Sequence, residues 1–473
     1  MKILFLQESN LEESLGVANL SAVLKANGHI CDVLVQSAEG KDFFNKIKAI
    51  NPQIAAFSCA TGAHVWANKV AGEVKKINNA VTIMGGMHPT IYSEESIKEE
   101  NIDIICIGEG EYPLLDLANN LEKGSAITGI QNLWVKKENR VYKNDLRNLN
   151  DVNSLPFPDR GLYYKYDYNC LMTAKRFISS LGCPFHCSFC QNTVLIKKFK
   201  GKGVFIRKKN VDRVIKEVLL IKEKYPLDLV HFSDDIFALD KSWLREFSQK
   251  FKKQVNLPFN CNIRISCADK ETIELLSQAG CHAVTFGLES GNEFLRNEII
   301  SKNIVNEEII EKSSILKDSG IKILTSNMIV LPNETIDNAY ETIHLNRKIR
   351  VDYTRIFIAK PFKGTKLFEY GEENGLLEPH VYSTESFENL DNTFFKNEHK
   401  KELLNLRYLF REIIRHPALE PLSRFLIKLP LSGLYKIIFF YNRVIQEQRF
   451  FKVNFFRGIR IAFKLRGGFG KKF

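Results

Sequence analysis

The chain lacks the features that mark several protein classes. Its first apolar run, MKILFLQ, is shorter than a secretory h-region and is followed at once by acidic residues, so we expect no signal peptide and a cytoplasmic protein. No low-complexity segment or short internal repeat is present. With 27 Gly, 14 Pro, 44% hydrophobic and 26% charged residues, the composition excludes a collagen, a disordered acidic protein and a polytopic membrane protein. A length of 473 residues is enough for two or three domains of a globular enzyme.

The 10 cysteines of the chain are far too few for a disulfide-rich composition. Without a signal peptide, this predicts reduced thiols or metal ligands rather than a disulfide scaffold. Charge is unevenly spread along the chain, which has 67 Lys and Arg and 55 Asp and Glu. Residues 400–473 contain 17 of the basic and 4 of the acidic residues, and the rest of the chain contains 50 basic and 51 acidic residues. The body is therefore neutral, and the basic character belongs to the C-terminal segment.

Residues 1–125 alternate apolar runs with amphipathic stretches of helical spacing. The predicted strands are Lys2–Gln7, Cys31–Val35, Ile54–Ser58, Val81–Gly85 and Ile104–Ile107. Strands separated by helices imply crossover connections, so we predict an α/β domain with a doubly wound parallel sheet of flavodoxin-like type. Ligands of such sheets bind beyond the carboxyl ends of the strands. Residues 126–175 are predicted to be an irregular linker, stiffened by the two prolines of LPFPDR.

The alternation resumes between residues 176 and 370. The predicted strands are Phe177–Leu181, Asp228–Phe232, Phe259–Ile263, Ala283–Gly287, Lys322–Ile329 and Tyr353–Ile358. Six βα units fall short of the eight of a closed barrel, so we predict an open, partial (β/α)6 barrel of the TIM type. Residues 371–473 are predicted to follow as a helical, basic C-terminal segment.

Three cysteines stand close together in the sequence LGCPFHCSFCQN. Cys183, Cys187 and Cys190 form a C-x3-C-x2-C pattern after the first predicted barrel strand, where active-site loops begin. Thiolates are soft ligands for zinc or iron–sulfur clusters. A zinc knuckle completed by Cys170 or His186 is one interpretation. Three close cysteines without a second CxxC pair fit a closed zinc site poorly and favour a four-iron cluster with one iron left open.

Polar residues follow the other predicted barrel strands and would point toward the same mouth. They are Asp234, Asp235, Asn262, Arg264, Glu289, Ser326 and Asn327. An amino-acid-like ligand needs carboxylates for its ammonium group and a cation, preferably Arg, for its carboxylate. A ribose needs hydrogen-bond acceptors, which Glu289 and Asn327 could supply. Taken singly, each residue could be an exposed loop residue, but their convergence points to a binding site.

The cysteine pattern, with Phe189 before its third cysteine and FSDDIF, GLESG and PFKGT at successive strand ends, resembles the radical S-adenosylmethionine (SAM) superfamily. The first domain, with Ser58, GGMHPT from Gly85 and GEGE from Gly108, resembles the cobalamin-binding domain fused to one branch of that superfamily. That branch includes the class B methylases, the hopanoid methylases and the anaerobic magnesium-protoporphyrin ester cyclase. The resemblance covers residues 1–370.

The resemblance implies a 4Fe–4S cluster on Cys183, Cys187 and Cys190, whose open iron would chelate the amino and carboxylate groups of SAM. Reductive cleavage of SAM would give a 5′-deoxyadenosyl radical that abstracts hydrogen from an unactivated carbon. The implied SAM-binding residues are Phe189 near the adenine, Asp234 and Asp235 near the ammonium, Arg264 (or, as second choice, Lys302) at the carboxylate, Glu289 at the ribose, and Asn327. The implied cobalamin-binding residues are Ser58, Gly85, Gly86, His88, Gly108 and Glu109, with His64 as a further candidate for the pocket.

The first domain departs from the cobalamin-binding pattern at one loop. Domains that ligate cobalt through histidine carry Asp-x-His-x-x-Gly after the first strand, whereas residues 8–16 contain no histidine. A bound corrinoid is therefore expected to keep its nucleotide tail in the sheet without a histidine on cobalt. Under-coordinated cobalt favours the reduced state that accepts a methyl group from SAM.

These features predict a radical SAM enzyme that uses cobalamin to methylate an unactivated carbon of a small-molecule or lipid-like substrate. Reducing electrons would come from an external flavodoxin- or ferredoxin-type donor. A rearrangement or cyclisation without methyl transfer is an alternative within the class. A zinc-stabilised RNA-binding or RNA-modifying protein is the alternative from another class.

The C-terminal segment combines basic residues with aromatic ones, as in Phe439–Tyr441, Phe450–Phe451 and Phe455–Phe456. This combination is typical of a segment at an anionic membrane surface. Lys428 and Lys436 divide its apolar stretch, so no uninterrupted run is long enough for a membrane-spanning helix. We therefore expect residues 400–473 to form either a peripheral contact with the inner membrane face or a helical cap on the barrel. A nucleic-acid partner is not expected, because nothing basic continues into the body.

Overall fold

The computed structural model describes residues 1–9, 13–389 and 391–450. The chain begins with a parallel sheet whose strands have the spatial order β2-β1-β3-β4-β5, continued by β6 and β7. The parallel strands are β1 (Lys2–Gln7), β2 (Ile30–Val35), β3 (Ile54–Ser58), β4 (Val81–Gly85) and β5 (Ile104–Cys106). Their apolar runs are buried because helices cover both faces of such a sheet. The order is that of a doubly wound flavodoxin-like fold, which confirms the predicted class.

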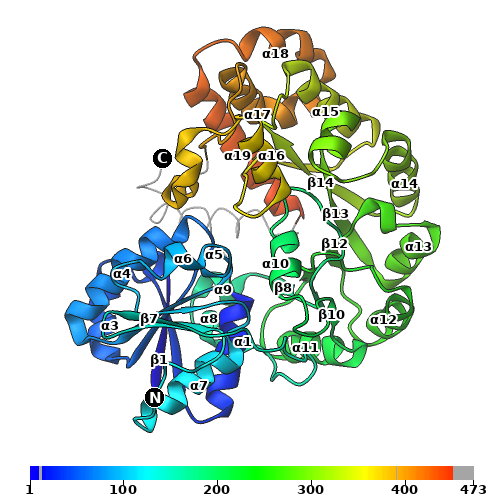
Figure 1. Cartoon of the computed structure of the whole chain (residues 1–473). Helices are drawn as coiled ribbons and strands as arrows, with labels where there is room; N and C mark the ends of the chain where they lie inside the picture. Colours follow the sequence, from blue (N-terminus) through cyan, green and yellow to red (C-terminus); the bar gives the residue numbers. More distant parts are fainter. Residues whose placement is uncertain (10–12, 390, 451–473) are drawn as a thin grey trace.

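Helices connect the strands of this sheet, as Figure 1 shows in blue and cyan. They are α1 (Leu15–Ala26), α2 (Gln36–Glu39), η1 (Gly40–Asp42), α3 (Phe43–Ile50), α4 (Ala63–Asn78), α5 (Met87–Ile91), α6 (Ser93–Ser96) and α7 (Glu111–Glu122). The side chain of Ser14 caps α1 by accepting a hydrogen bond from the backbone N–H of Val17.

The segment predicted to be an irregular linker contains two strands, which corrects that prediction. β6 (Leu133–Lys137) pairs antiparallel with β5, and β7 (Arg140–Lys143) pairs antiparallel with β6. In β6, Leu133 and Val135 are buried and alternate with more exposed residues, the period-two pattern of a strand with one solvated face. The remainder of the segment is irregular apart from α8 (Gly161–Tyr164) and α9 (Asp167–Leu171).

The second sheet has six parallel strands in the order in which they occur along the chain. They are β8 (Ala174–Phe177), β11 (Leu229–Phe232), β12 (Phe259–Asn262), β13 (Cys281–Glu289), β14 (Lys322–Ile329) and β15 (Tyr353–Ile358). The strands curve into an open half-barrel (Figure 1), which confirms the predicted partial barrel. A short antiparallel ribbon of β9 (Ser180–Leu181) and β10 (Arg207–Lys208) lies after β8.

Helices follow the strands of the half-barrel in the manner of βα units. They are α10 (Asn192–Lys198), α11 (Val211–Lys224), α12 (Lys241–Gln254), η2 (Ile265–Cys267), α13 (Lys270–Ala279), the π-helix η3 (Leu295–Ile299), α14 (Asn306–Asp318), α15 (Ile336–Lys348) and α16 (Lys366–Glu373). Asp240 and Asp269 cap α12 and α13 by accepting hydrogen bonds from backbone N–H groups of their first turns.

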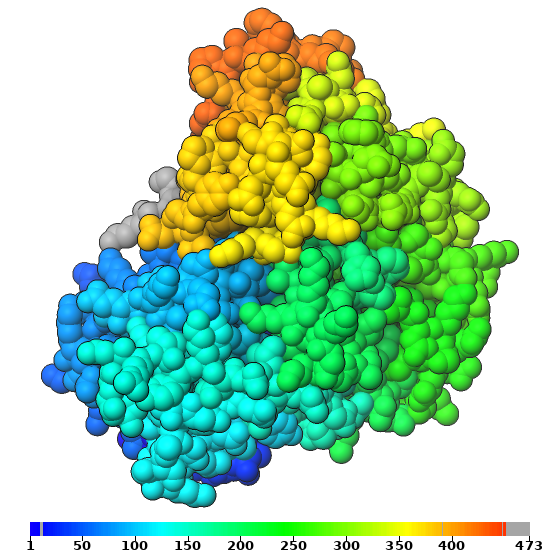
Figure 2. All heavy atoms as spheres, viewed as in Figure 1, coloured from blue at the N-terminus to red at the C-terminus, as the bar shows by residue number. Residues whose placement is uncertain are grey.

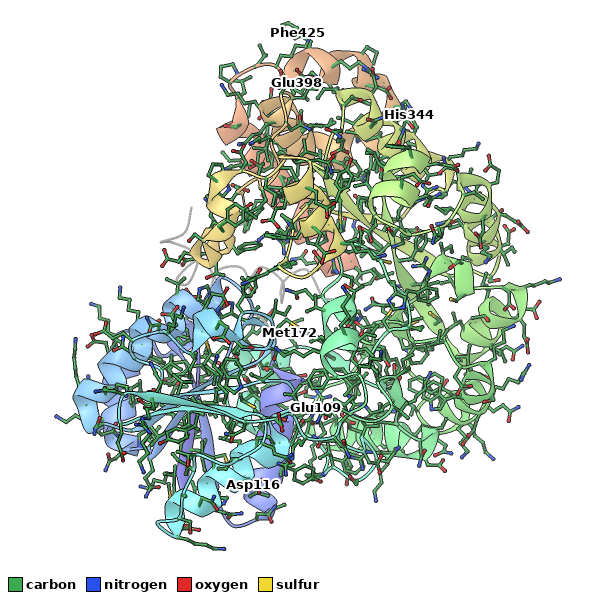
Figure 3. The ribbon with its side chains drawn as sticks, viewed as in Figure 1. Glu109, Asp116, Met172, His344, Glu398 and Phe425 are labelled. Carbon is green, nitrogen blue, oxygen red and sulfur yellow. The ribbon has the colours of Figure 1, made fainter. Side chains whose placement is uncertain are left out.

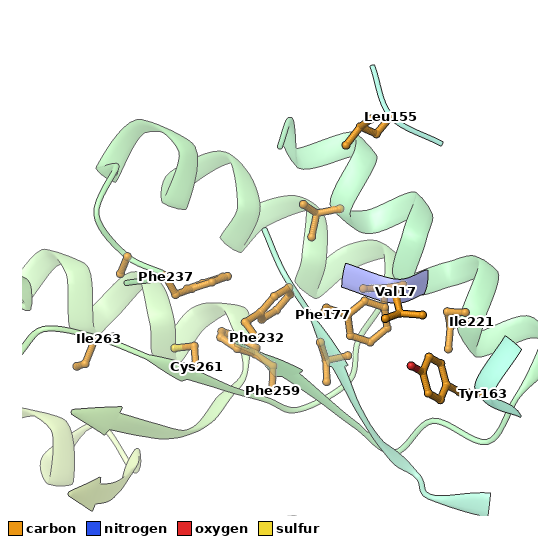
Figure 4. Close-up of a cluster of buried hydrophobic side chains, with 14 of the residues drawn as sticks. Val17, Leu155, Tyr163, Phe177, Ile221, Phe232, Phe237, Phe259, Cys261 and Ile263 are labelled. Atoms are coloured by element: carbon orange, nitrogen blue, oxygen red, sulfur yellow. The ribbon is translucent and has the colours of Figure 1, made fainter. Parts of the chain in front are cut away.

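One hydrophobic core continues from the first sheet into the half-barrel. Its aromatic centre is formed by Phe177, Phe232, Phe237 and Phe259, and Val17 of α1 lies near Phe177 in Figure 4. Tyr163 and Leu155 of the linker belong to the same cluster. The linker thus packs the two sheets against each other rather than tethering them loosely.

The linker residue Arg160 reinforces this junction with buried polar contacts. Its guanidinium donates hydrogen bonds to Glu13 (2.5 Å), to Glu217 of α11 (3.2 Å) and to the carbonyl of Arg176 in β8 (2.6 Å). The ring of Phe177 lies 4.4 Å from the guanidinium carbon. These contacts fix the N-terminal sheet, the linker and the half-barrel in one arrangement.

The C-terminal residues that the structure describes form helices on the half-barrel. These are η4 (Pro379–Tyr382), η5 (Thr384–Glu388), α17 (Lys400–Arg415), η6 (Pro417–Leu419), α18 (Glu420–Leu426) and α19 (Ser432–Phe450). The buried face of α17 shares a core with α15 and β15. Phe450, at the end of α19, accepts a hydrogen bond from Asn260 inside the half-barrel. The helical prediction is therefore confirmed for residues 400–450, and residues 451–473, including Phe455–Phe456, lie outside the described residues. Among the described helices, none is both long and apolar enough to cross a membrane.

Candidate active site

The cysteine loop begins at a turn that requires glycine. Gly182 has φ +88°, and a Cβ there would lie 2.6 Å from the carbonyl oxygen of Phe205. Beyond the turn, Ser188 anchors the loop to the end of η3, because its N–H donates to the Ile300 carbonyl (2.9 Å) and its hydroxyl donates to the Ile299 carbonyl (2.6 Å). The loop thus begins at a glycine turn and is held to η3 between Cys187 and Cys190.

Cys187 acts electrostatically on both of the neighbouring thiols, Cys183 and Cys190. Burial raises the pKa of Cys190 to about 11, and the neighbouring Cys187, Asp235 and Cys183 raise it further. Burial likewise raises the pKa of Cys183, with Asp235 and Cys187 adding to the effect. A raised pKa means that the thiol keeps its proton, whereas a bound metal cation favours the thiolate and deprotonates a coordinating thiol. Within the described residues, no three His, Cys, Asp or Glu side chains converge closely enough to hold a single metal ion.

Arg264 lies directly against the cysteine loop. Its Nη1 donates a hydrogen bond to the sulfur of Cys187 at 3.5 Å, and its guanidinium carbon lies 4.0 Å from the ring centroid of Phe185. The same guanidinium donates to the backbone carbonyl of Lys302. The positive charge predicted after the third barrel strand is therefore held beside the cysteines.

Glu289 and Lys302 form a buried ion pair at the carboxyl end of β13. Lys302 Nζ lies 3.1 Å from Glu289 Oε1. Glu289 has a left-handed backbone (φ +66°), and the pairing of β13 with β14 shifts register between Gly287 and Glu289. The bulge turns the carboxylate back over Gly287, where a Cβ would lie 1.9 Å from Glu289 Oε1. The sequence predicts Lys302 as the alternative to Arg264 at the carboxylate of SAM, whereas the structure pairs it with Glu289.

The two aspartates after β11 have different surroundings. Asp234 is buried and accepts hydrogen bonds from the backbone N–H and hydroxyl of Ser179 and from the hydroxyl of Ser180. Its carboxylate is therefore engaged in holding the β8–β9 turn. Asp235 accepts a hydrogen bond from Asn192 at 3.0 Å, and burial raises its pKa. Of the pair, Asp235 is the carboxylate whose charge acts on the cysteine thiols.

Asn327 does not lie at the mouth of the half-barrel, contrary to the sequence prediction. It is fully buried, accepts a hydrogen bond from Asn346 of α15 (2.9 Å) and donates to Thr325 (3.1 Å) and the Arg355 carbonyl (3.0 Å). Successive strand residues point to opposite faces, so Asn327 faces the helix layer. Phe189 is partly buried in a cluster with Phe362 and Met328, beside the cysteine loop.

The carboxyl edge of the first sheet brings Ser58, Gly85 and Gly86 together. Ser58 pairs with Gly85 in register, and its side chain is exposed. Gly86 has φ +95°, and a Cβ there would lie 2.9 Å from the backbone N and O of Cys59. The loops after β3 and β4 therefore pack backbone to backbone, with Ser58 exposed beside them.

His88 lies in α5, two residues after Gly86, and is buried. Its ring stacks on that of His64 with centroids 3.8 Å apart and on Tyr92 at 5.3 Å. Burial lowers the pKa of His88 to about 3 and that of His64 to about 4, so both rings are neutral at pH 7. His64 Nε2 contacts the hydroxyl of Thr384 (3.0 Å), whereas His88 Nε2 is buried without a hydrogen-bond partner.

Gly108 and Glu109 connect the two sheets instead of lining an open edge. A Cβ on Gly108 would lie 2.4 Å from the ring of Phe199, which follows α10. Glu109 forms an ion pair with Arg207 of β10 at 2.6 Å and accepts a hydrogen bond from the N–H of Asn150 at 2.7 Å. Figure 3 places Glu109 at this junction. The structure thus gives both residues a role in domain contact that sequence reasoning missed.

Helix α10 brings the cysteine loop to the carboxyl edge of the first sheet. It begins two residues after Cys190 and ends at Lys198, whose Nζ donates to the Thr90 carbonyl (2.7 Å) and to the hydroxyl of Ser93 (3.1 Å). Figure 1 shows α10 between the two domains. The two edges where parallel sheets bind ligands therefore adjoin.

Family models and known proteins match this arrangement. A model of the radical SAM superfamily matches residues 177–345, and a model of the B12 binding domain matches residues 2–118. The chain is a radical SAM enzyme with a B12-binding domain. The first model contains the three cysteines and distinguishes the cluster interpretation from the zinc knuckle. The two domains imply a 4Fe–4S cluster, SAM and cobalamin as cofactors.

Three relatives illustrate the similarity of this radical SAM chain. An uncharacterised methyltransferase of Pyrococcus horikoshii is 28% identical over 452 residues, which cover 90% of this chain and 94% of that protein. The anaerobic magnesium-protoporphyrin IX monomethyl ester cyclase of Rubrivivax gelatinosus is 25% identical over 75% of this chain and 65% of its own length. The solved structure of OxsB, a cobalamin-dependent SAM radical enzyme with aqua-cobalamin and SAM bound, superposes with a TM-score of 0.69 over 98% of this chain and 75% of OxsB, at 15% identity. At that identity the superposition shows a shared fold.

Proposed function

We propose that the chain methylates an unactivated carbon of a small molecule, with cobalamin and radical SAM chemistry in one site between its two domains. The observation that carries the proposal is the docking of α10, which joins the cysteine loop to Thr90 and Ser93, in the segment that follows Gly86. The methyltransferase names of several relatives, including that of Pyrococcus horikoshii, support methylation. A rearrangement or cyclisation without methyl transfer is the alternative, supported by the ester cyclases among the relatives.

The donor set of the cysteine loop fits an iron–sulfur cluster. We assign Cys183, Cys187 and Cys190 as its ligands, because their thiols share one loop and Cys187 acts electrostatically on the other two. When bound, the cluster supplies the electron that cleaves SAM. Arg264 would hold positive charge beside the cluster and meet the carboxylate of SAM, and Asp235 would face its ammonium group.

The ribose and adenine of SAM would lie against residues farther along the mouth. Glu289 offers acceptor atoms for the ribose, with Lys302 holding the carboxylate in place. Phe189 would pack against the adenine. Asp234 and Asn327 would act indirectly, because their side chains hold the β8–β9 turn and the α15 contact respectively.

The carboxyl edge of the first sheet fits the nucleotide tail of a corrinoid. Ser58 offers an exposed hydroxyl, Gly85 and Gly86 allow close approach of backbone, and the orphaned Nε2 of His88 is a buried polar atom available to a ligand at this edge. When bound, cobalamin supplies a carrier for the methyl group. The loop after β1 contains no histidine, although its residues 10–12 lie outside the described residues.

The remaining partners are proposed from the chemistry. An external flavodoxin- or ferredoxin-type protein would supply electrons in the cytoplasm, and nucleic acid is not expected as a partner. Residues 176–370 are proposed as the radical SAM domain and residues 371–473 as the C-terminal segment. Because β6 and β7 complete the first sheet, we extend the cobalamin-binding domain from 1–125 to include them, which shortens the linker of 126–175.

Product analysis tests the proposal. Anaerobically reconstituted protein is loaded with cobalamin, and SAM and a strong reductant are added. Methylation predicts both S-adenosylhomocysteine and 5′-deoxyadenosine, the former only with corrinoid bound. If 5′-deoxyadenosine forms alone and corrinoid has no effect, the non-methylating alternative holds.

A further inference from the structure

The outer faces of α18 and α19 carry large exposed apolar side chains. We call this surface the α18–α19 apolar face; it consists of Leu422 and Phe425 from α18 and Leu434, Ile437 and Tyr441 from α19. Phe425 is 61% exposed and Ile437 is 68% exposed. Figure 3 shows Phe425 at the outermost end of the C-terminal helices, pointing away from the protein. Clustered apolar exposure of this kind marks an interaction site.

Buried anchors hold both helices so that this face must point outward. In α18, the hydroxyls of Ser423 and Tyr340 lie 2.6 Å apart, and in α19 the Tyr435 hydroxyl donates to the Leu426 carbonyl at 2.9 Å. Two residues turn a helix by about 200°. Phe425 and Ile437 each follow an anchor by two positions and therefore lie on the opposite side of their helices. The exposure is fixed by packing and is not a consequence of loose ends.

Positive charge borders the apolar face. Lys428, in the turn between the helices, is exposed, whereas the exposed Arg443 follows Tyr441 by two positions and lies on another side of α19. The one described acidic side chain of α18, Glu420, is paired with Arg347 and with His344 (2.8 Å). Arg424 is paired with Asp337 at 2.7 Å. Exposed cations beside apolar side chains complement an anionic surface that also offers an apolar phase.

We propose that the α18–α19 apolar face docks the enzyme on the surface of an anionic lipid bilayer. Phe425, Ile437 and their neighbours would enter the boundary between headgroups and acyl chains, while Lys428 meets an anionic headgroup. In Figures 1 and 2, α18 lies at the opposite end of the molecule from the cobalamin-binding domain, and Figure 1 shows α19 running from that end toward the middle. Docking through α18 and the start of α19 leaves the cobalamin-binding domain exposed to solution. The sequence predicts a membrane contact somewhere in residues 400–473, and the proposal assigns that contact to the five side chains of the α18–α19 apolar face. Membrane docking does not depend on the methylation chemistry.

Vesicle flotation tests the proposal with the full-length protein. The probes are vesicles of phosphatidylcholine alone and vesicles containing phosphatidylserine, at low and high salt. The double variant Phe425→Glu with Ile437→Glu removes the apolar contact. The matched control is Phe294→Glu with Ile30→Glu, since Phe294 is 63% and Ile30 is 62% exposed on other parts of the surface. Circular dichroism and thermal melting confirm that each variant is folded.

We expect wild-type protein and the control to float with phosphatidylserine vesicles, less so at high salt, and the apolar-face variant to lose about tenfold or more of this affinity. Equal flotation of the apolar-face variant and the wild type would overturn the proposal and assign binding to another segment. Failure of the wild type to float would also overturn it. A wild-type dimer that becomes monomeric in the apolar-face variant would show that a second copy occupies the surface instead.

Discussion

Lys302 donates a hydrogen bond to Glu289 at 3.1 Å, and the pair lies over Gly287, which has no side chain. Both charged groups are buried, at the end of β13 and after the π-helix that follows it. A buried ion pair of this kind is costly to break, because one charge is left without its partner. The pair therefore holds a carboxylate in a fixed position at the mouth of the half-barrel, beside Arg264 and the cysteine loop.

The first prediction concerns the carboxylate of Glu289. Glu289→Gln keeps a hydrogen-bond acceptor but removes the charge, and we expect SAM to bind about 10- to 100-fold more weakly, the range for a hydrogen bond to a charged group. Iron and sulfide content should be unchanged, because Glu289 is not a cluster ligand. Isothermal titration with SAM measures the effect, and Glu311→Gln on the exposed surface of α14 is the control. Unchanged SAM affinity in Glu289→Gln would remove Glu289 from the site.

The second prediction concerns the space above Gly287. Its backbone is not left-handed, so alanine adds no backbone strain, but the new Cβ would lie 1.9 Å from Glu289 Oε1 and 2.4 Å from Lys302 Nζ. We expect Gly287→Ala to displace the ion pair and weaken SAM binding to the same degree as Glu289→Gln. Gly320→Ala is unsuitable as a control because of its positive φ, whereas Gly129→Ala meets open space. Full SAM affinity in Gly287→Ala would show that the position of the pair is unimportant.

The third prediction separates the two cofactor sites. Gly86→Ala would place a Cβ 2.9 Å from the backbone of Cys59 at a left-handed φ of +95°. We expect the loops after β3 and β4 to shift, so that the variant no longer retains a corrinoid. The protein is incubated with hydroxocobalamin and passed through gel filtration, and the visible absorbance of the protein fraction measures the corrinoid that remains bound. The iron content should remain that of the wild type. A variant that retains corrinoid would contradict the placement of the nucleotide tail at this edge.

The fourth prediction follows from the neutral ring of His88. Its pKa is lowered from 6.5 to about 3 in the folded protein, first by burial and then by His64. Between these values the unfolded chain binds more protons, so the free energy of unfolding rises with pH and falls on acidification. At pH 5 this one group costs about 2 kcal/mol relative to neutral pH.

The variant His88→Phe keeps an aromatic ring between His64 and Tyr92 but removes the titrating group. Denaturant unfolding at pH 7 and pH 5 should show a smaller loss of stability on acidification in this variant than in the wild type. An identical loss in both proteins would show that His88 does not titrate as its burial requires.

Much of the fold follows from the sequence because parallel strands buried on both faces are continuous apolar runs. β1, β3, β4, β14 and β15 have the predicted bounds without change. The hairpin β6–β7 was missed because its strands are short and carry lysines on a solvated face. Its signal was only the alternation of Leu133 and Val135.

The candidate site was less predictable, because a position at a strand end does not determine which way a side chain points. Asn327 shows this limit: one residue along β14 reverses the face, so it contacts Asn346 instead of the mouth. The partnership of Lys302 with Glu289 depends on a bulge and a π-helix that no periodicity reveals. The spacing of the three cysteines predicts the cluster site well, because all three proposed ligands lie within one short loop and their proximity does not depend on the rest of the fold.

The most direct test measures 5′-deoxyadenosine from SAM and dithionite, with anaerobically reconstituted protein, in the wild type and in the variant with Cys183, Cys187 and Cys190 all changed to alanine. The account predicts that the wild type binds iron and sulfide and releases 5′-deoxyadenosine, and that the variant does neither while remaining folded. Formation of 5′-deoxyadenosine by the alanine variant, or none by an iron-loaded wild type, would contradict it.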